Sequence, residues 1–298
     1  MEEIERIDTV KQYNDSVGVG TLHPLVSVVD FDEIPTYQYF RRYMGVYAVF
    51  LKNIKCGDMK YGCQNYDYED GTLVFIAPGQ IYGVDSYGEI IKPSGKALVF
   101  HPDLLLGTHL AQDIKNYTFF NYEVNEALHL SKKERDTIED CLNKTAEEID
   151  KNIDKHSKTL IVSTIELFLN YCMRFYDRQF ITRTNANKDI LTRFENLLND
   201  YFDSDKALEL GFPSVTYCAN QLHLSPNYFG DLIKKETGNT ALDYIQLRLI
   251  DEAKKKIANS NESLNTISFQ LGFKYQQHFT RLFKQKTGVT PNEFRNLN

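Results

Sequence analysis

The sequence predicts an α+β protein, in which a β-rich amino-terminal domain with following helices precedes an all-α domain of two helix-turn-helix units joined by a linker helix. Three observations support this prediction. Short runs of β-branched and aromatic residues alternate with turn signals over residues 20–110. Amphipathic helical patterns begin near Ser131. The end of the chain contains an internal repeat, which indicates two copies of one structural unit.

Composition and length are those of an ordinary globular protein of two domains. The chain has 298 residues, of which 42% are hydrophobic and 25% are charged. It begins without a basic, apolar leader and contains no uninterrupted apolar run of membrane-spanning length, so we expect a cytoplasmic protein without membrane contact. The five cysteines are odd in number and include no CxxC pair, which favours reduced thiols over disulfides or a zinc site.

Charge is divided unevenly along the chain. Residues 211–298 contain 11 Lys and Arg side chains against 7 Asp and Glu, a balance of +4. The whole chain has a net charge of -7, so the preceding residues carry a balance of -11. The basic segment coincides with the repeat, which favours a nucleic-acid partner for that segment.

Four runs in the amino-terminal region predict strands, at residues 25–31, 46–52, 72–77 and 97–101. Their spacing favours a small sandwich or barrel over about residues 20–110. Aromatic side chains are dense here, and they either line a ligand cavity or fill the core. The candidate effector-pocket residues are Tyr47, Phe50, Phe75 and Tyr82.

Two helices are expected over about residues 131–180. The first spans residues 131–153, where Ser131 and Glu134 have the spacing of a capping box. The second spans residues 159–176 and carries an apolar seam, which forms either a homodimer interface or a contact with the barrel. We favour the dimer interface, and its candidate residues are Ile161, Ile165, Phe168, Cys172 and Phe175.

The polar segment that follows predicts the domain boundary. Residues 178–188 lack apolar periodicity, so the expected division is a first domain at 1–180, a linker at 181–188 and a second domain at 189–298. An amphipathic pattern at residues 189–202 predicts the opening helix of the second domain.

The repeat relates the two halves of the second domain. Six residues recur 50 positions later, namely Phe229, Leu232, Lys234, Thr237, Gly238 and Thr240. Two others, Ser214 and Leu222, recur 49 positions later. The second turn therefore contains one inserted residue.

Each half reads as a short helix, a turn and a second helix. In the first half, Ser225 at the N-cap and Pro226 after it predict a helix start, and Gly238 predicts its end. In the second half, Ser263 predicts the cap of the short helix. The expected buried faces of the two longer helices are Phe229, Leu232 and Ile233, then Phe279, Leu282 and Phe283.

The outward faces of the two longer helices carry the candidate DNA contacts. Gln and Arg make bidentate contacts to adenine and guanine edges in the major groove, whereas Lys suits phosphate. The candidates of the first half are Ser225, Asn227, Gly230, Asp231, Lys234 and Lys235. Those of the second half are Lys274, Gln276, Gln277, Thr280, Arg281 and Lys284.

Between the halves, residues 241–258 predict one helix with an apolar face formed by Leu242, Ile245, Leu249, Ala253 and Ile257. A helix of this length spans about 27 Å at about 1.5 Å per residue. Successive major-groove faces are about 34 Å apart. One rigid rod therefore suffices to place both longer helices on the same side of a duplex.

The carboxy-terminal sequence resembles the AraC/XylS family of bacterial transcription regulators. The resemblance rests on Ser225–Phe229, Ile233–Gly238, Leu271–Phe273, His278–Lys284 and Thr287–Pro291 with Arg295. It implies two helix-turn-helix subdomains that bind consecutive major grooves of promoter DNA. A regulator that reads two half-sites needs a dimer surface, which is why we favour dimerisation.

Three positions depart from the family pattern. Gly230 has no side chain and Asp231 repels phosphate, which weakens the expectation of base reading by the first half. Ser268 stands where the family usually has Ala. Tyr275 occupies the capping position of the second longer helix.

The amino-terminal half resembles the cupin-like sensor barrels that often accompany this domain, through residues 72–80 and 100–102. His23, His101 and His109 form no HxH pair, so we expect no metal and no cofactor. No enzyme motif is present, and we expect no enzyme activity.

The expected function is a dimeric transcription regulator controlled by a small molecule or another signal. Its expected partners are double-stranded promoter DNA, an unknown small-molecule effector and a second copy of the chain, with RNA polymerase as a further partner to consider. Two alternatives remain: a regulator whose barrel is purely structural, and a cupin metalloenzyme fused to a DNA-binding domain.

Overall fold

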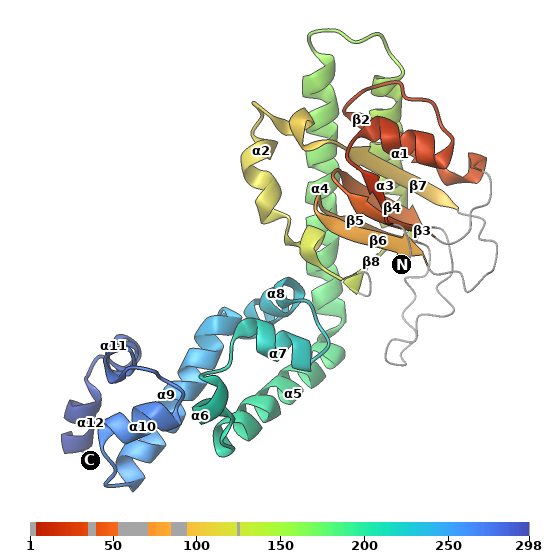
Figure 1. The fold of residues 1–298 in the computed structure, drawn as a ribbon. Helices are drawn as coiled ribbons and strands as arrows, with labels where there is room; N and C mark the ends of the chain where they lie inside the picture. Colours follow the sequence, from red (N-terminus) through yellow and green to blue (C-terminus); the bar gives the residue numbers. More distant parts are fainter. Residues whose placement is uncertain (1–3, 35–39, 53–70, 85–93, 124–125, 298) are drawn as a thin grey trace. The chain divides into compact units, whose positions relative to one another are not determined.

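The computed structural model describes residues 4–34, 40–52, 71–84, 94–123 and 126–297 (Figure 1). The chain divides into two compact units, Met1–Thr182 and Arg183–Asn298. The first unit combines two β-sheets with helices, and the second is entirely helical in its described residues. The fold is therefore mixed, with the sheets in the amino-terminal part.

The larger sheet of the first unit has five strands in the order β2-β7-β4-β5-β8, and every neighbouring pair is antiparallel. The strands are β2 (Val26–Asp30), β7 (Gly95–Phe100), β4 (Tyr47–Lys52), β5 (Thr72–Ile76) and β8 (Leu128–His129). The four predicted strands are confirmed as β2, β4, β5 and β7, because their β-branched and aromatic residues suit a buried sheet.

A second sheet has three strands in the order β1-β3-β6. It comprises β1 (Glu5–Ile7), β3 (Phe40–Met44) and β6 (Gln80–Val84), with β1 parallel to β3. Helix α1 (Val10–Val17) follows β1 and is capped by Thr9 through a capping box. Buried side chains from both sheets and from α1 form one cluster, which includes Ile7, Val10, Met44, Phe50, Val74 and Val99.

The other face of the five-stranded sheet is covered by aromatic side chains. Helix η1 (Phe31–Glu33) follows β2. Four short helices lie between β7 and β8, namely η2 (Pro102–Leu105), α2 (Leu110–Asp113), η3 (Ile114–Asn116) and η4 (Thr118–Asn121). Phe120 of η4 lies 5.0 Å from the Tyr47 ring and 5.5 Å from the Phe75 ring. These contacts belong to the packed interior of the first unit.

The candidate effector-pocket residues therefore do not line one cavity. Phe50 belongs to the cluster between the sheets, where its ring lies 6.5 Å from that of Tyr13. Tyr47 and Phe75 lie on the opposite face, because successive side chains of a strand alternate between faces. The side chain of Tyr82 lies outside the described residues. The prediction that Tyr47, Phe50 and Phe75 line one pocket was wrong, because their side chains lie on opposite faces of the sheet.

Helices α3 (Lys132–Ile149) and α4 (Ser157–Thr182) pack against each other beside the sheet (Figure 1). The predicted capping box is confirmed, since Ser131 accepts from the Glu134 amide and Glu134 accepts from the Ser131 amide. The predicted apolar seam of α4 is buried within the unit, with exposed fractions of 0–7% at Ile161, Ile165, Phe168, Cys172 and Phe175. These side chains pack inside one chain and are not available to a second copy. The prediction that they form a dimer interface is therefore replaced by the alternative, a packing contact within the first unit.

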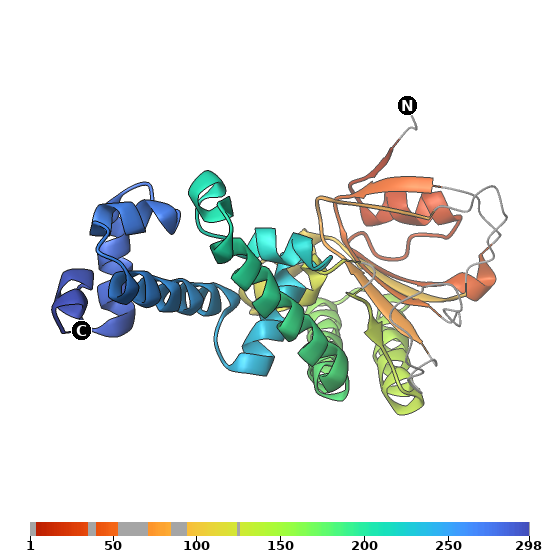
Figure 2. The same cartoon turned by 90° about the horizontal axis from the view of Figure 1, so that it is seen from below.

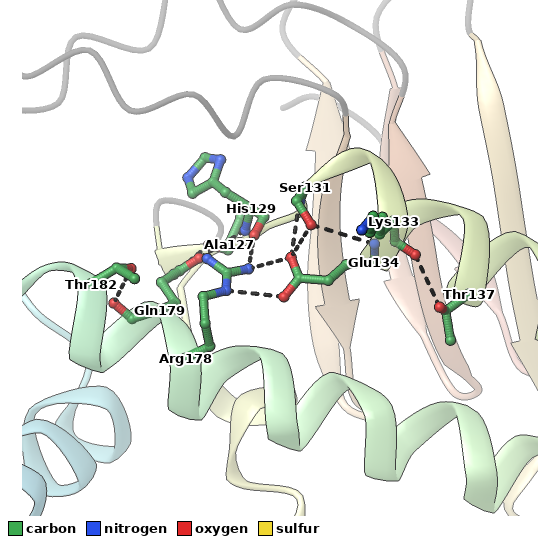
Figure 3. Close-up of polar contacts among 9 residues, drawn as sticks. All are labelled: Ala127, His129, Ser131, Lys133, Glu134, Thr137, Arg178, Gln179 and Thr182. Carbon is green, nitrogen blue, oxygen red and sulfur yellow. Dashed lines mark hydrogen bonds and ion pairs between the residues drawn. The ribbon is translucent and has the colours of Figure 1, made fainter.

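The carboxy-terminal end of α4 is held to the edge of the sheet by polar contacts (Figure 3). Arg178 donates to both carboxylate oxygens of Glu134, at 3.0 and 2.7 Å, and to the carbonyl of His129 at 2.7 Å. Gln179 accepts from the His129 amide at 2.8 Å and donates to the Ala127 carbonyl at 3.2 Å. The Gln179 amide thus bonds the main chain on the β8 side as a neighbouring strand would.

The segment expected as a polar linker is helical. Helix α4 continues to Thr182 and α5 begins at Thr184, so only Arg183 separates them. Gln179 is buried and bonded to the β8 edge, and buried Asn187 donates to Glu236 at 2.9 Å. The boundary between the two units, after Thr182, falls inside the segment 181–188 that the sequence assigns as the linker. What the sequence did not predict is that this segment is helical.

The second unit is built on two long helices. Its elements are α5 (Thr184–Asp203), α6 (Lys206–Leu210), α7 (Val215–Gln221), α8 (Pro226–Thr237), α9 (Ala241–Asn259), α10 (Leu264–Gln270), α11 (Gln276–Thr287) and α12 (Pro291–Leu297). Phe194 of α5 is fully buried, and its ring lies 4.9 Å from Phe229 and 5.4 Å from Tyr244. This aromatic core joins α5, α8 and α9.

Helix α9 confirms the predicted connecting helix and runs from the α7–α8 half to the α10–α11 half (Figure 2). Its buried face includes Ile245, Leu249, Ala253 and Ile257, as expected. Leu242 is an exception with 44% exposure, because Ala241 occupies the buried position at the start of the helix.

Candidate nucleic-acid interface

Helix α8 begins and ends where its sequence signals predict. The Ser225 hydroxyl accepts from the Tyr228 amide at 3.2 Å, and Gly238 ends the helix in a left-handed conformation with φ 76°. Phe229, Leu232 and Ile233 are buried. Ser225 is also buried and acts as the helix cap, so its side chain is not on the outward surface with the other candidate DNA contacts.

The outward surface of α8 is chemically sparse. Asn227, Lys234 and Lys235 are exposed, whereas Gly230 and Asp231 are half-buried. A Cβ on Gly230 would meet nothing within 4 Å. The first half thus offers one amide and two ammonium groups, which suit phosphate and limited base contact.

Helix α11 has the same architecture with a different start. Phe279 and Phe283 are fully buried, Leu282 is half-buried, and Gly288 ends the helix with φ 85°. Tyr275 is the N-cap residue and makes no side-chain cap hydrogen bond. The start of α11 is therefore stabilised by the preceding turn and by packing between the buried side chains of Phe273 and Phe279, whose rings lie 5.4 Å apart.

The second half gathers most of its candidate DNA contacts on one concave surface. An open depression of about 480 Å³ is lined by Gln276, Gln277, Thr280, Arg281 and Lys284. Gln277, Arg281 and Lys284 are exposed, while Gln276 and Thr280 are half-buried. Lys274 is exposed in the turn before the helix. These side chains can donate and accept hydrogen bonds at base edges and neutralise phosphates.

Polar contacts join α9 to α5 and α11 to α9. Tyr244 of α9 donates to Glu195 of α5 at 2.6 Å, and burial together with this bond raises the pKa of Tyr244 to about 12. Lys286 of α11 donates to Asp243 of α9 at 2.7 Å. The hydrogen bond from Lys286 lowers the pKa of the Asp243 carboxyl below its ordinary value.

Two aromatic residues beside the depression were not among the predicted contacts. Tyr275 has 64% exposure and its ring lies 5.7 Å from that of His278, which is also exposed. The position of Tyr275 directly before the first turn of α11 could have indicated from the sequence that its ring lies near the candidate DNA contacts. An exposed aromatic ring at the start of such a helix is suited to contact a sugar or a thymine methyl group.

Three of the five cysteines fall within the described residues and are free and buried, namely Cys141, Cys172 and Cys218. Burial raises the pKa of each of these thiols, and that of Cys218 reaches about 12. Cys56 and Cys63 lie outside the described residues.

Among the described residues, no group of three or more His, Cys, Asp or Glu side chains is placed to hold a metal ion. None of the helices in the described ranges has the length and apolar character of a membrane span.

Two similar helix-turn-helix halves on one helical frame define a tandem helix-turn-helix protein. Comparison with known proteins supports this class. A family model described as a helix-turn-helix domain matches residues 218–297. The uncharacterized HTH-type transcriptional regulator YobQ of Bacillus subtilis is 38% identical over 74 residues, which are 25% of this chain and 31% of YobQ.

Two further relatives extend the comparison. The transposon Tn10 TetD protein of Escherichia coli is 31% identical over 126 residues, 42% of this chain and 82% of TetD. The arabinose operon regulatory protein of Escherichia coli K12 is 29% identical over 92 residues, 31% of each chain. The chain belongs to the AraC/XylS family of transcription regulators. For YobQ and several other curated relatives, the chain covers less than half of the relative's own length.

Proposed function

We propose that this protein is a sequence-specific DNA-binding transcription regulator in which α11 is the principal base-reading helix. The observation that carries the proposal is the depression on α11, where two glutamines, a threonine, an arginine and a lysine gather on one exposed surface. Arg281 suits guanine and Gln277 suits adenine, each through two hydrogen bonds.

Helix α8 has a supporting role in this proposal. Its exposed Lys234 and Lys235 suit phosphate, and Asn227 is its one exposed amide near the helix start. The absence of a side chain at Gly230 lets the helix backbone approach the duplex closely. We therefore expect the first half to contribute affinity and register more than base discrimination.

A direct test compares Arg281→Ala and Gln277→Ala with the unchanged protein in mobility-shift assays on promoter fragments. Each lost bidentate contact should reduce the preference for specific over random DNA by about 1–3 kcal/mol. Lys151→Ala is a matched control for Arg281→Ala, because it removes one positive charge from a side chain of 65% exposure in the first unit. An unchanged preference in both α11 variants would show that α11 does not read bases.

The first unit is proposed to act as a cupin-like sensor of a small molecule or another signal. Two sheets with a shared core and the resemblance of residues 72–80 support this role. Self-association and contact with RNA polymerase remain part of the proposal without assigned surfaces, because the predicted dimer seam is buried. Sedimentation velocity of the purified protein tests self-association, and genome-wide mapping of bound sites suggests the signal through the neighbouring genes.

A regulator with a purely structural first unit is the second candidate. It is favoured by the packing of Phe50, Tyr47 and Phe75, which fill two separate interior layers rather than line one cavity. Metal analysis tests the third reading, a cupin enzyme: iron, zinc or manganese near one per chain would support it.

A further inference from the structure

The turn between α10 and α11 is crossed by main chain from the first half of the unit. Gly272 lies in this turn with φ +88°. A Cβ at this position would lie 2.5 Å from the Gly211 carbonyl carbon, 2.5 Å from the Phe212 nitrogen and 2.7 Å from the Ala207 oxygen. These neighbours are main-chain atoms, so no side-chain rotation can relieve the overlap.

The crossing segment is itself fixed at several points. Gly211 donates to the Ala207 carbonyl at 3.0 Å, and Tyr201 of α5 donates to the Gly211 carbonyl at 2.8 Å. The Phe212 ring stacks on Phe273 with centroids 6.0 Å apart. Residues 207–212, which follow α5 and precede α7, are therefore pinned between α5 and the turn that leads into α11.

The corresponding turn of the first half shows that this glycine is required by the contact. The repeat aligns His223 with Gly272, and His223 also has a positive φ, of 59°. His223 is exposed. The turn geometry alone thus accommodates a histidine, whereas the second half excludes any Cβ because residues 207–212 occupy that space.

We propose that the contact between Gly211 and Gly272, together with the Phe212–Phe273 stack, is a joint that fixes the spacing and rotation between α8 and α11. This inference rests on the proposed function of DNA recognition. Helix α9 is one connection between the halves, and the joint is a second one. Two connections prevent the second half from swivelling about the end of α9.

The joint makes half-site spacing part of the specificity. One inserted base pair shifts a half-site by about 3.4 Å and rotates it by about 35° around the duplex. A rigid pair of helices cannot follow that change, whereas a pair joined by α9 alone can adjust. Phe212 and Gly272 are therefore positioning residues that select operators by spacing without touching DNA.

The test measures binding to a specific site and to versions with one base pair added or removed between the half-sites. The unchanged protein should bind the altered spacings at least tenfold more weakly. Gly272→Ala should reduce this spacing penalty at least threefold. Gly288→Ala is the matched control, because Gly288 has φ +85° and a Cβ there would meet nothing within 4 Å. It introduces backbone strain without the overlap, so it should keep the spacing penalty.

Phe212→Ala gives a second route to the same result if Gly272→Ala does not fold, since Phe212 is 40% exposed and is not central to the core. It should also reduce the spacing penalty.

Amide hydrogen exchange at residues 271–273 in free protein gives a readout without DNA. Phe212→Ala should speed this exchange at least fivefold, and Gly288→Ala should not. Unchanged exchange and spacing dependence in Phe212→Ala would overturn the joint. Failure of the unchanged protein to select any DNA sequence, with exchange altered as expected, would instead overturn the proposed function and leave the joint standing as a structural contact.

Discussion

At the scale of single residues, the backbone of the first helix-turn-helix turn is strained. His223 is the one non-glycine residue with positive φ in the described part of the chain. A left-handed conformation costs a side chain with a Cβ roughly 1–2 kcal/mol. The repeat places Gly272 at the equivalent position of the second turn, so a residue free of this strain exists within the same sequence.

Replacing His223 with glycine should therefore stabilise the second unit. Relief of the left-handed strain outweighs the entropy cost of glycine, so His223→Gly should raise the free energy of unfolding by about 0.5–1 kcal/mol. Urea denaturation of the variant and the unchanged protein measures this difference. His278→Gly is a suitable contrast, because His278 is exposed in the first turn of helix α11 and has no left-handed strain, so glycine there should not raise stability. A destabilised His223→Gly variant would mean that the imidazole makes a compensating contact.

Residue-level signals predicted the helix starts that are capped by serine. The predicted caps at Ser131, Ser225 and Ser263 all form, because a serine followed by a helical pattern satisfies free amides locally. The close approach of Gly211 and Gly272 could not be predicted in this way. The sequence shows two glycines 61 positions apart, but only the folded chain shows that their main chains meet.

At the scale of elements, strands and helices stabilised by their own apolar residues could be predicted, whereas those stabilised by contacts with distant residues could not. Strands β2, β4, β5 and β7 were predictable because their apolar runs are buried in the larger sheet. Strands β1 and β3 were not, because they pair across 37 residues and β3 carries Arg41 and Arg42. Helix α4 extends beyond its apolar seam because polar side chains at its end have partners, chiefly Arg178 and Gln179 (Figure 3).

The end of α4 should depend on the Arg178 side chain. Its guanidinium joins Glu134 and the His129 carbonyl, and the Arg178 and Glu134 side chains are only 22% and 16% exposed. Removal leaves a poorly solvated carboxylate and an unpaired carbonyl, so Arg178→Ala should lower the free energy of unfolding by about 1–3 kcal/mol. Chemical denaturation followed by circular dichroism measures the change.

Arg174→Ala is the matched control on the same helix. Arg174 is exposed, and its guanidinium carbon lies 6.0 Å from the centre of the Tyr171 ring. Its loss should change stability by less than about 1 kcal/mol. Equal effects of the two substitutions would contradict a specific role for the contacts between α4 and the sheet edge.

At the scale of the whole molecule, the repeat and the charge distribution were the sequence features that best predicted the architecture and the partner of the second unit. Duplication predicted two similar halves and the helix between them, because both halves must bury the same face. The exposure of α8 and α11 side chains follows helical periodicity closely. The assignment of those side chains to DNA contacts stays a prediction. The pocket assignment was wrong because a count of aromatic residues does not show which face of a sheet each one occupies.

Selection of bound sequences from a random DNA library tests the central claim most directly. The unchanged protein should enrich a strongly preferred block of bases, read by α11, and a weaker block about 10 base pairs away, which is one turn of the duplex. Arg281→Ala should lose the base preference in one block and keep it in the other, because α11 is proposed to read a single major groove. Enrichment of no motif, or of the same motif by both proteins, would contradict the assignment of α11 as the principal base-reading helix.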